Sequence, residues 1–118
     1  MRIVPKQLGI EVSNRCNLKC KGCPTVANNG KFHTGDMSLE LFKSIVDRID
    51  FPTSVLAYFT GEPFMNRDYL QMVEYLNEKK QKWYTVSNLT IWREDVVREC
   101  LKPGSYCYQF VVSLDGLF

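Results

Sequence analysis

The spacing of apolar side chains divides the chain into alternating strand-like and helix-like segments. Leu8, Ile10 and Val12 alternate with small or polar residues, which is the period of a strand with two unlike faces. Three later runs, rich in β-branched and aromatic residues or bounded by turn-forming residues, predict further strands. The predicted strands cover residues 8–13, 54–59, 83–87 and 108–113.

Helical spacing fills each interval between these strands. Leu41, Phe42 and Ile45 begin one apolar stripe, and Ser38 is suited to cap the helix that carries it. Pro52 lies just beyond the end of this helix, where a residue without a backbone N–H is tolerated. The predicted helices cover residues 38–50, 68–80 and 93–101.

The order of these elements is β-α-β-α-β-α-β, which predicts an α/β fold with a parallel sheet of about four β-α units. Right-handed crossovers through such helices produce a barrel, a half-barrel or a doubly wound sheet. At 118 residues the chain is expected to form one domain, residues 1–118. Functional sites in parallel folds gather at the carboxyl ends of the strands.

Composition and charge exclude several classes of protein. The chain is 45% hydrophobic and 24% charged, as folded globular proteins are, and its net charge of +2 is too small to indicate a nucleic-acid or membrane partner. No segment has the roughly 20 apolar residues of a membrane span, and the N-terminus lacks a signal-peptide pattern. We therefore expect a cytoplasmic protein whose five cysteines are thiols or ligands and not disulfides.

Three of the cysteines stand close together in the long polar segment 14–36, which follows the first predicted strand. Cys16, Cys20 and Cys23 form the pattern C-x3-C-x2-C. Three thiolates on one loop suit a four-iron, four-sulfur (4Fe-4S) cluster, which would keep one iron open for another ligand. The same cysteines also suit a structural zinc ion completed by His33, or three ordinary thiols. The spacing alone leaves these three interpretations open.

Three further polar motifs follow the later strands. Each is also a plausible turn, since Gly-Glu-Pro suits a turn into a helix and Ser-Leu-Asp-Gly is a common turn composition. Their order is informative because each follows a different predicted strand, and parallel strands end at one edge of a sheet. The motifs are Thr60-Gly61-Glu62-Pro63, Ser87-Asn88 and Ser113-Leu114-Asp115-Gly116.

The cysteine loop and the three motifs together resemble the radical S-adenosylmethionine (SAM) superfamily, and in particular its peptide-modifying members. The resemblance covers nearly the whole chain and implies the N-terminal portion of a partial, open TIM-like barrel. It implies that Cys16, Cys20 and Cys23 are the ligands of a 4Fe-4S cluster. The residues that it implies for binding SAM are Gly61, Glu62, Pro63, Ser87, Asn88, Ser113 and Asp115.

The resemblance also implies a reaction and its partners. In this family one electron from the cluster cleaves SAM to methionine and a 5'-deoxyadenosyl radical, which abstracts a hydrogen atom from the substrate. The implied partners are a one-electron reductant of the flavodoxin or ferredoxin type and, from the motif at Ser113, a peptide or protein substrate. Glu11 faces away from Ile10 and Val12, so that it either points into the lumen, if the apolar residues pack on helices, or is solvated at an edge.

Two residues depart from the pattern of the family. Gly22 stands where members usually have an aromatic residue near adenine, and Thr60 replaces the first glycine of their Gly-Gly-Glu-Pro element. Members also close six or more β-α units, so we expect the fourth strand to have an open edge. The chain is then expected to be a truncated product, an excised fragment or a half that a partner chain completes. The competing hypothesis is a non-catalytic half-barrel, which binds zinc through the three cysteines and His33 or acts as an interaction module.

Overall fold

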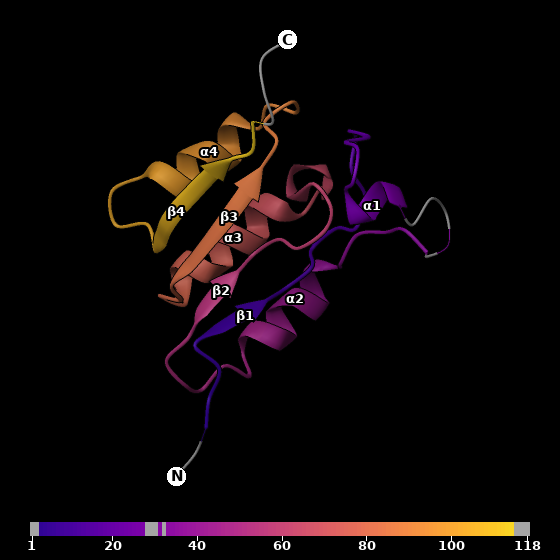
Figure 1. The fold of residues 1–118 in the computed structure, drawn as a ribbon. Helices are drawn as coiled ribbons and strands as arrows, with labels where there is room; N and C mark the ends of the chain where they lie inside the picture. Colours follow the sequence, from indigo (N-terminus) through magenta and orange to yellow (C-terminus); the bar gives the residue numbers. More distant parts are fainter. Residues whose placement is uncertain (1–2, 28–30, 32, 115–118) are drawn as a thin grey trace.

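The computed structural model describes residues 3–27, 31 and 33–114 and contains one parallel four-stranded sheet. The strands lie side by side in chain order, so that each pairs with the strand that follows it in the sequence (Figure 1). This arrangement confirms the predicted α/β fold with an open parallel sheet. The strands are β1 (Gln7–Gly9), β2 (Ser54–Leu56), β3 (Trp83–Ser87) and β4 (Cys107–Val112).

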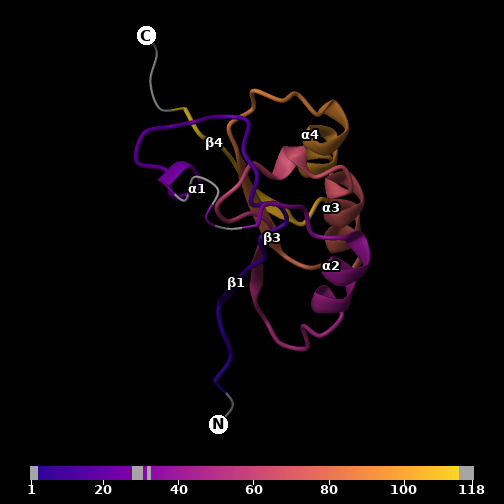
Figure 2. The same cartoon turned by 90° about the vertical axis from the view of Figure 1, so that its right-hand side faces the viewer.

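Three helices cover one side of the sheet, and the loop that carries the cysteines lies apart from them (Figure 2). Ser38 caps the first of the three, since its hydroxyl accepts a hydrogen bond from the backbone N–H of Leu41 at 3.2 Å. The three helices are α2 (Leu39–Val46), α3 (Tyr69–Glu78) and α4 (Glu94–Leu101). Two short helices, α1 (Pro24–Ala27) and the 3-10 helix η1 (Pro63–Met65), belong to the loops.

The hydrophobic core lies between these helices and the sheet. Phe42 from α2, Met72 from α3 and Trp83 from β3 are completely buried there. Tyr69 is also completely buried, and its hydroxyl donates to the backbone oxygen of Ala57 at 2.9 Å. The core therefore holds the carboxyl ends of β2 and β3 against α3, which is the edge where the sequence motifs fall.

The first two strands are shorter than the predicted ranges 8–13 and 54–59. Ile10 still donates its N–H to Leu56, but further along Ser13 forms an isolated antiparallel bridge with Asp36. The chain therefore leaves β2 and pairs with the end of its own long loop. Alternation of apolar residues continues through this departure because Ile10 remains buried, so the pattern alone could not reveal where the strand ends.

The first two large helices also end before the predicted residues 50 and 80. Beyond Val46, the N–H groups of Arg48 and Ile49 bond three residues back, which tightens the chain into turns. Beyond Glu78, Lys80 adopts a left-handed conformation with φ of 54°, which stops the helix. Among the described residues, no helix is long and apolar enough to cross a membrane.

Candidate functional site

A cavity of about 210 Å³ lies at the carboxyl ends of the strands and brings the separate sequence motifs together. All three cysteines of the polar loop contribute to its wall, and so do residues that follow β2, β3 and β4. The predicted site residues that line it are Cys16, Cys20, Cys23, Gly61, Glu62, Ser87, Asn88 and Ser113. Pro63 is buried at the start of η1 and does not line the cavity, and Asp115 lies outside the described residues.

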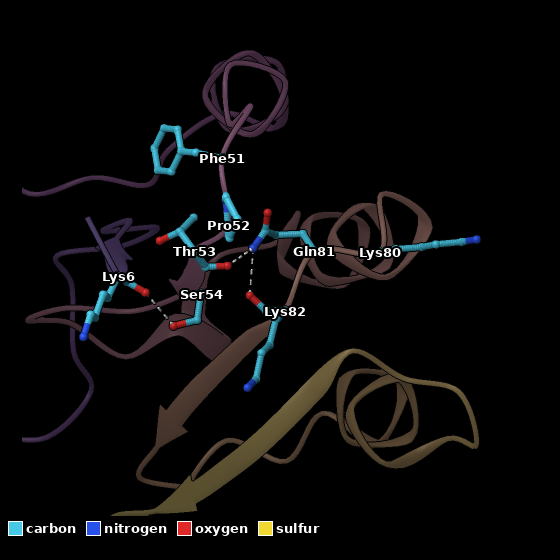
Figure 3. Close-up of a pocket in the computed structure, with 8 residues that line it drawn as sticks. All are labelled: Lys6, Phe51, Pro52, Thr53, Ser54, Lys80, Gln81 and Lys82. Atoms are coloured by element: carbon cyan, nitrogen blue, oxygen red, sulfur yellow. Dashed lines mark hydrogen bonds between the residues drawn. The ribbon is translucent and has the colours of Figure 1, made fainter. Parts of the chain in front are cut away.

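A second hollow, of about 500 Å³, lies at the opposite end of the sheet, where Ser54 begins β2 (Figure 3). It contains none of the predicted site residues. Its lysines do not converge, because Lys80 extends away from Lys6 (Figure 3). The side chain of Gln81 is already occupied, since it donates to the backbone oxygens of Thr53 at 2.7 Å and Lys82 at 3.0 Å. The first cavity is therefore the candidate site.

The cysteine loop owes its shape to a left-handed glycine. Gly22 has φ of +79°, which an L side chain rarely adopts, and it lies between Cys20 and Cys23. The N–H of Cys23 donates to the backbone oxygen of Cys20 at 3.2 Å, and α1 begins at the next residue. Cys20 is exposed, whereas Cys16 and Cys23 are half-buried. This backbone conformation gives a physical reason for glycine at a position where the family usually has an aromatic residue.

The Gly-Glu-Pro turn packs directly against the start of the cysteine loop. A β-carbon on Gly61 would lie 2.6 Å from the backbone oxygen of Arg15 and nearer still to that of Ser13, so no larger residue fits without displacing the backbone. The N–H of Glu62 donates to the backbone oxygen of Arg15 at 2.7 Å. The turn after β2 thus fixes the residue that immediately precedes Cys16.

Glu62 is 2% exposed and connects the ends of β2 and β3. Its carboxylate accepts hydrogen bonds from the Ser87 hydroxyl at 2.8 Å and from the Asn88 backbone N–H at 2.8 Å. It also accepts from the N–H of Phe64 at 3.1 Å, which caps η1. A carboxylate with three donors aimed at it is well stabilised despite its burial.

Thr60, which replaces a glycine of the family pattern, takes part in two contacts. Its hydroxyl donates to the exposed Glu11 carboxylate, which also accepts from the Thr60 backbone N–H at 3.3 Å. Its backbone oxygen accepts from the hydroxyl of Thr25, the second residue of α1, at 2.6 Å. Thr60 therefore connects the end of β1 with the helix that follows the third cysteine.

The neck of the cysteine loop is closed by an ion pair. The Arg15 guanidinium donates to the Asp36 carboxylate at 2.5 and 3.1 Å, and the Ser13 hydroxyl donates to the same carboxylate at 2.7 Å. Partial burial raises the pKa of Asp36, but the hydrogen bonds from Arg15 and Ser13 lower it, and the net pKa lies below the ordinary value of 3.8. Asn14 reinforces the closure, accepting from Gly35 at 2.7 Å.

The remaining histidine and cysteines lie away from the cavity wall. His33 is exposed, and its backbone oxygen accepts a hydrogen bond from Asn14. Within the described part of the chain, no three His, Cys, Asp or Glu side chains are grouped closely enough to hold a single metal ion. Cys100 is buried in the core and Cys107 packs against it, as expected for small apolar residues. A hydrogen bond with Cys107, together with burial, raises the pKa of the Cys100 thiol.

Several residues that shape the site carry no signal in the sequence. Arg15 and Asp36 are 21 positions apart, and nothing in their local pattern distinguishes them from other surface charges. Asn66 is 2% exposed, and its amide donates to the backbone oxygens of Val12 and Met37 at 2.7 and 3.0 Å. Such contacts depend on which loops meet in space, and that is set by the whole fold.

The arrangement fits an iron–sulfur cluster by the chemistry of its donors. Three thiols from one loop line the same cavity, and thiolates are the usual protein ligands of such clusters. Beside them lie the turn at Gly61 and the polar residues Ser87 and Asn88, and oriented backbone groups at such a turn are suited to a zwitterionic ligand. Fold and site thus define a parallel α/β protein with a three-cysteine loop at the carboxyl ends of its strands.

Comparison with known protein families shows to which family a protein of this class belongs. The family model of the Radical SAM superfamily matches residues 10–118, so the chain belongs to that superfamily. The cofactors of the family are a 4Fe-4S cluster and SAM, as the sequence resemblance predicted.

Curated relatives carry different names. Fe-coproporphyrin III synthase from Methanosarcina barkeri is 31% identical over 90% of this chain and 26% of its own length. A second relative, from Pyrococcus furiosus, is the cofactor-modifying protein of the tungsten-containing aldehyde ferredoxin oxidoreductase. It is 28% identical over 84% of this chain and 28% of its own length. The antilisterial bacteriocin subtilosin biosynthesis protein AlbA from Bacillus subtilis is 28% identical. This match covers 97% of this chain and 25% of the length of AlbA. The chain thus spans about a quarter of the length of these relatives.

A solved structure agrees with the fold. BtrN in complex with AdoMet and 2-DOIA superposes with a TM-score of 0.75 at 21% identity, over 95% of this chain and 46% of BtrN. BtrN in an open conformation gives a TM-score of 0.72. The chain therefore has the fold of about half of BtrN.

Proposed function

We propose that this chain holds a 4Fe-4S cluster through Cys16, Cys20 and Cys23 and binds SAM in the adjoining cavity. When bound, the cluster would supply the electron that cleaves SAM to methionine and a 5'-deoxyadenosyl radical, which abstracts a substrate hydrogen atom. The observation that carries the proposal is the single cavity lined by these cysteines and by the residues after three strands. The family's cofactors, which are the cluster and SAM, support it.

The residues of the cavity would position SAM by two kinds of contact. Gly61 lines the cavity beside the cysteine loop, and its backbone groups are proposed to contact the amino acid end of SAM. Ser87 and Asn88 stand across the cavity and are proposed to line the ribose region. Ser113, which donates its N–H to the Ser87 oxygen at 2.9 Å, extends this wall, and Asp115 is assigned the same role from its motif.

We also propose a peptide or protein as the substrate. The motif that begins at Ser113 supports this assignment, and so does the likeness to AlbA, whose name refers to biosynthesis of the bacteriocin subtilosin. Tyr58 and Phe59 lie on the cavity wall and offer apolar surface next to the SAM region. A flavodoxin or ferredoxin is the proposed electron donor. The cytoplasm is the proposed location, because free thiols and a reducible cluster require a reducing compartment.

Anaerobic reconstitution with iron and sulfide tests the cluster. The expected product contains about four irons and four sulfides per chain and has a broad absorbance near roughly 400 nm. Replacing Cys16, Cys20 and Cys23 together with alanine should remove both, whereas replacing Cys100 and Cys107 should remove neither. Stoichiometric zinc in place of iron in protein purified without chelator would overturn the proposal and favour the non-catalytic half-barrel.

The reaction is tested separately on the reconstituted protein. SAM and a strong one-electron reductant should yield 5'-deoxyadenosine, measured by chromatography and mass spectrometry, and the triple cysteine variant should yield none. If a protein with a full cluster yields no 5'-deoxyadenosine, the three cysteines remain assigned as cluster ligands, and SAM cleavage by this chain is excluded.

A further inference from the structure

We propose that the side-chain amide of Asn88 is a positioning residue for the cluster, which donates a hydrogen bond to the sulfur of Cys16 and thereby sets the reduction potential. This inference rests on the proposed function, because it requires that Cys16 be a cluster ligand. The structure shows Nδ2 of Asn88 donating to Sγ of Cys16 at 3.7 Å, between residues 72 positions apart in the sequence. The backbone N–H of Leu18 donates to the same sulfur at 3.4 Å.

The surrounding contacts determine which end of the Asn88 amide faces the sulfur. Its oxygen accepts from the backbone N–H of Thr90 at 2.9 Å and from the Thr90 hydroxyl at 2.7 Å. A backbone N–H can only donate, so the oxygen must face Thr90 and the NH2 group must face the cysteine loop. One hydrogen of that group is directed to Cys16 and the other to the Asn17 side-chain oxygen, 3.2 Å away.

The position of Asn88 is fixed from both sides. Its backbone N–H donates to the buried Glu62 carboxylate at 2.8 Å, which fixes the main chain at the end of β3. On the other side, the Asn17 amide donates to the Thr90 hydroxyl at 2.6 Å, which closes a ring of hydrogen bonds through Asn17, Asn88 and Thr90. With its oxygen and both hydrogens used in this way, the amide serves the cysteine loop, and its side chain has no further donor for SAM.

A hydrogen bond to a ligating sulfur has a defined electrostatic effect. The donor stabilises negative charge on the thiolate, and the reduced cluster carries one more electron than the oxidised cluster. The bond therefore favours the reduced form and raises the reduction potential. Hydrogen bonds to the sulfurs are among the factors that set the potential of such clusters. Asn88 would thus ease delivery of the electron that SAM cleavage requires.

The experiment is a spectroelectrochemical titration of the reconstituted chain and two Asn88 variants, followed by electron paramagnetic resonance of the reduced cluster. Asn88→Asp keeps the acceptor for Thr90 and removes the donor to Cys16, while Asn88→Ala removes the donor without adding charge. Both should retain the iron content of the parent and shift the potential to more negative values. At a fixed applied potential we expect the ratio of reduced to oxidised cluster to fall about tenfold, which is a shift of about 59 mV for a one-electron couple.

Asn17→Asp is the charge control, since it adds the same charge beside the loop and keeps the donor from Asn88 to Cys16, while it removes the Asn17 donor to Thr90. A smaller shift in Asn17→Asp than in Asn88→Asp, together with a shift in Asn88→Ala, supports the direct bond. Unchanged potentials in both Asn88 variants, or equal shifts in the two aspartate variants without a shift in Asn88→Ala, overturn it. A parent chain that binds no cluster refutes the proposed function itself, and that result appears in the iron assay before any titration.

Discussion

The buried carboxylate of Glu62 accepts a hydrogen bond from the backbone N–H of Asn88 at 2.8 Å, although the two residues follow different strands. The Ser87 hydroxyl donates to the same carboxylate. Two motifs that are separate in the sequence are therefore one structural unit. Each motif alone has the composition of a turn, and their connection through Glu62 gives both turns fixed positions at the cavity.

Replacing Glu62 with glutamine should destabilise the chain by about 1–3 kcal/mol, the usual cost of leaving a buried polar group without a partner. Glutamine has one oxygen for the donors of Phe64, Ser87 and Asn88, and its NH2 group would face a donor. Urea unfolding followed by circular dichroism measures the change. Glu74→Gln is the matched control, because Glu74 is exposed on α3, and it should change the unfolding free energy by less than about 0.5 kcal/mol. Equal effects of the two variants would refute a buried junction at Glu62.

Replacing Gly61 with alanine should separate the turn after β2 from the cysteine loop. The new β-carbon would overlap the backbone oxygens of Ser13 and Arg15, and rigid backbone cannot give way as a flexible side chain can. We expect a loss of about 1–3 kcal/mol in unfolding free energy, together with a lower iron content after reconstitution.

Gly35→Ala provides the control for this substitution. A β-carbon at Gly35, which also lies in the region of the cysteine loop, would meet no atom within 4 Å. This variant should therefore keep the stability and iron content of the parent. If Gly61→Ala behaved in the same way, the close approach at Gly61 would have no energetic consequence, and the turn after β2 would not be what holds the cysteine loop in place.

Much of the fold could be predicted because it depends on local periodicity. The predicted strand 83–87 coincides with β3, whose alternate residues are buried, and the helix at 93–101 differs from α4 by one residue. The end of β1 could not be predicted, since Ser13 leaves the sheet to pair with Asp36, which is remote in sequence. Apolar alternation records which residues are buried, and it does not record with which partner a backbone group bonds.

The candidate site also has a part that could be predicted from the sequence and a part that could not. Cys16, Cys20 and Cys23 have a recognisable spacing, and the structure places all three on one cavity wall. The amide of Asn88 could be noticed from its position after a strand, but its bond to Cys16 could not, because that contact joins loops 72 residues apart. Arg15 and Asp36 had no signal at all. Spacing within one loop can be read from a sequence, whereas contacts between loops require the fold.

Removing the hydroxyl of Tyr69 should destabilise the core. That hydroxyl is completely buried and forms hydrogen bonds with the backbone oxygen of Ala57 and with the Thr85 hydroxyl, the latter at 2.7 Å. Burial raises the pKa of Tyr69 well above 10.0, so the hydroxyl remains protonated. In Tyr69→Phe the oxygen of Ala57 loses this donor, and we expect a cost of about 1–3 kcal/mol in unfolding free energy. Tyr106→Phe, at an exposed position, should cost nothing measurable in the same urea titration. A stability of Tyr69→Phe equal to the parent would contradict the assigned hydrogen bonds.

The ion pair of Arg15 and Asp36 predicts a pH dependence. Because the pKa of Asp36 is lowered in the folded chain, its ionised form favours folding. This contribution to the free energy of unfolding is fully present above the ordinary pKa of 3.8. It is lost as the pH falls through the lower pKa that Asp36 has in the folded chain. Asp36→Asn should therefore unfold more easily than the parent at pH 7, by about 0.5–1 kcal/mol, and the difference should shrink below about pH 4.

Urea unfolding of both proteins from pH 7 to pH 3 measures this difference, and iron content after reconstitution tests whether the ion pair also supports the cysteine loop. Asp95→Asn is the control: the pKa of Asp95 is also lowered, by a hydrogen bond from Arg93, but this pair lies at the start of α4. Both variants should converge with the parent at low pH, and only Asp36→Asn should lose iron, because only Asp36 closes the neck of the cysteine loop. A difference between Asp36→Asn and the parent that stays constant across the pH range would exclude titration of Asp36 as its source.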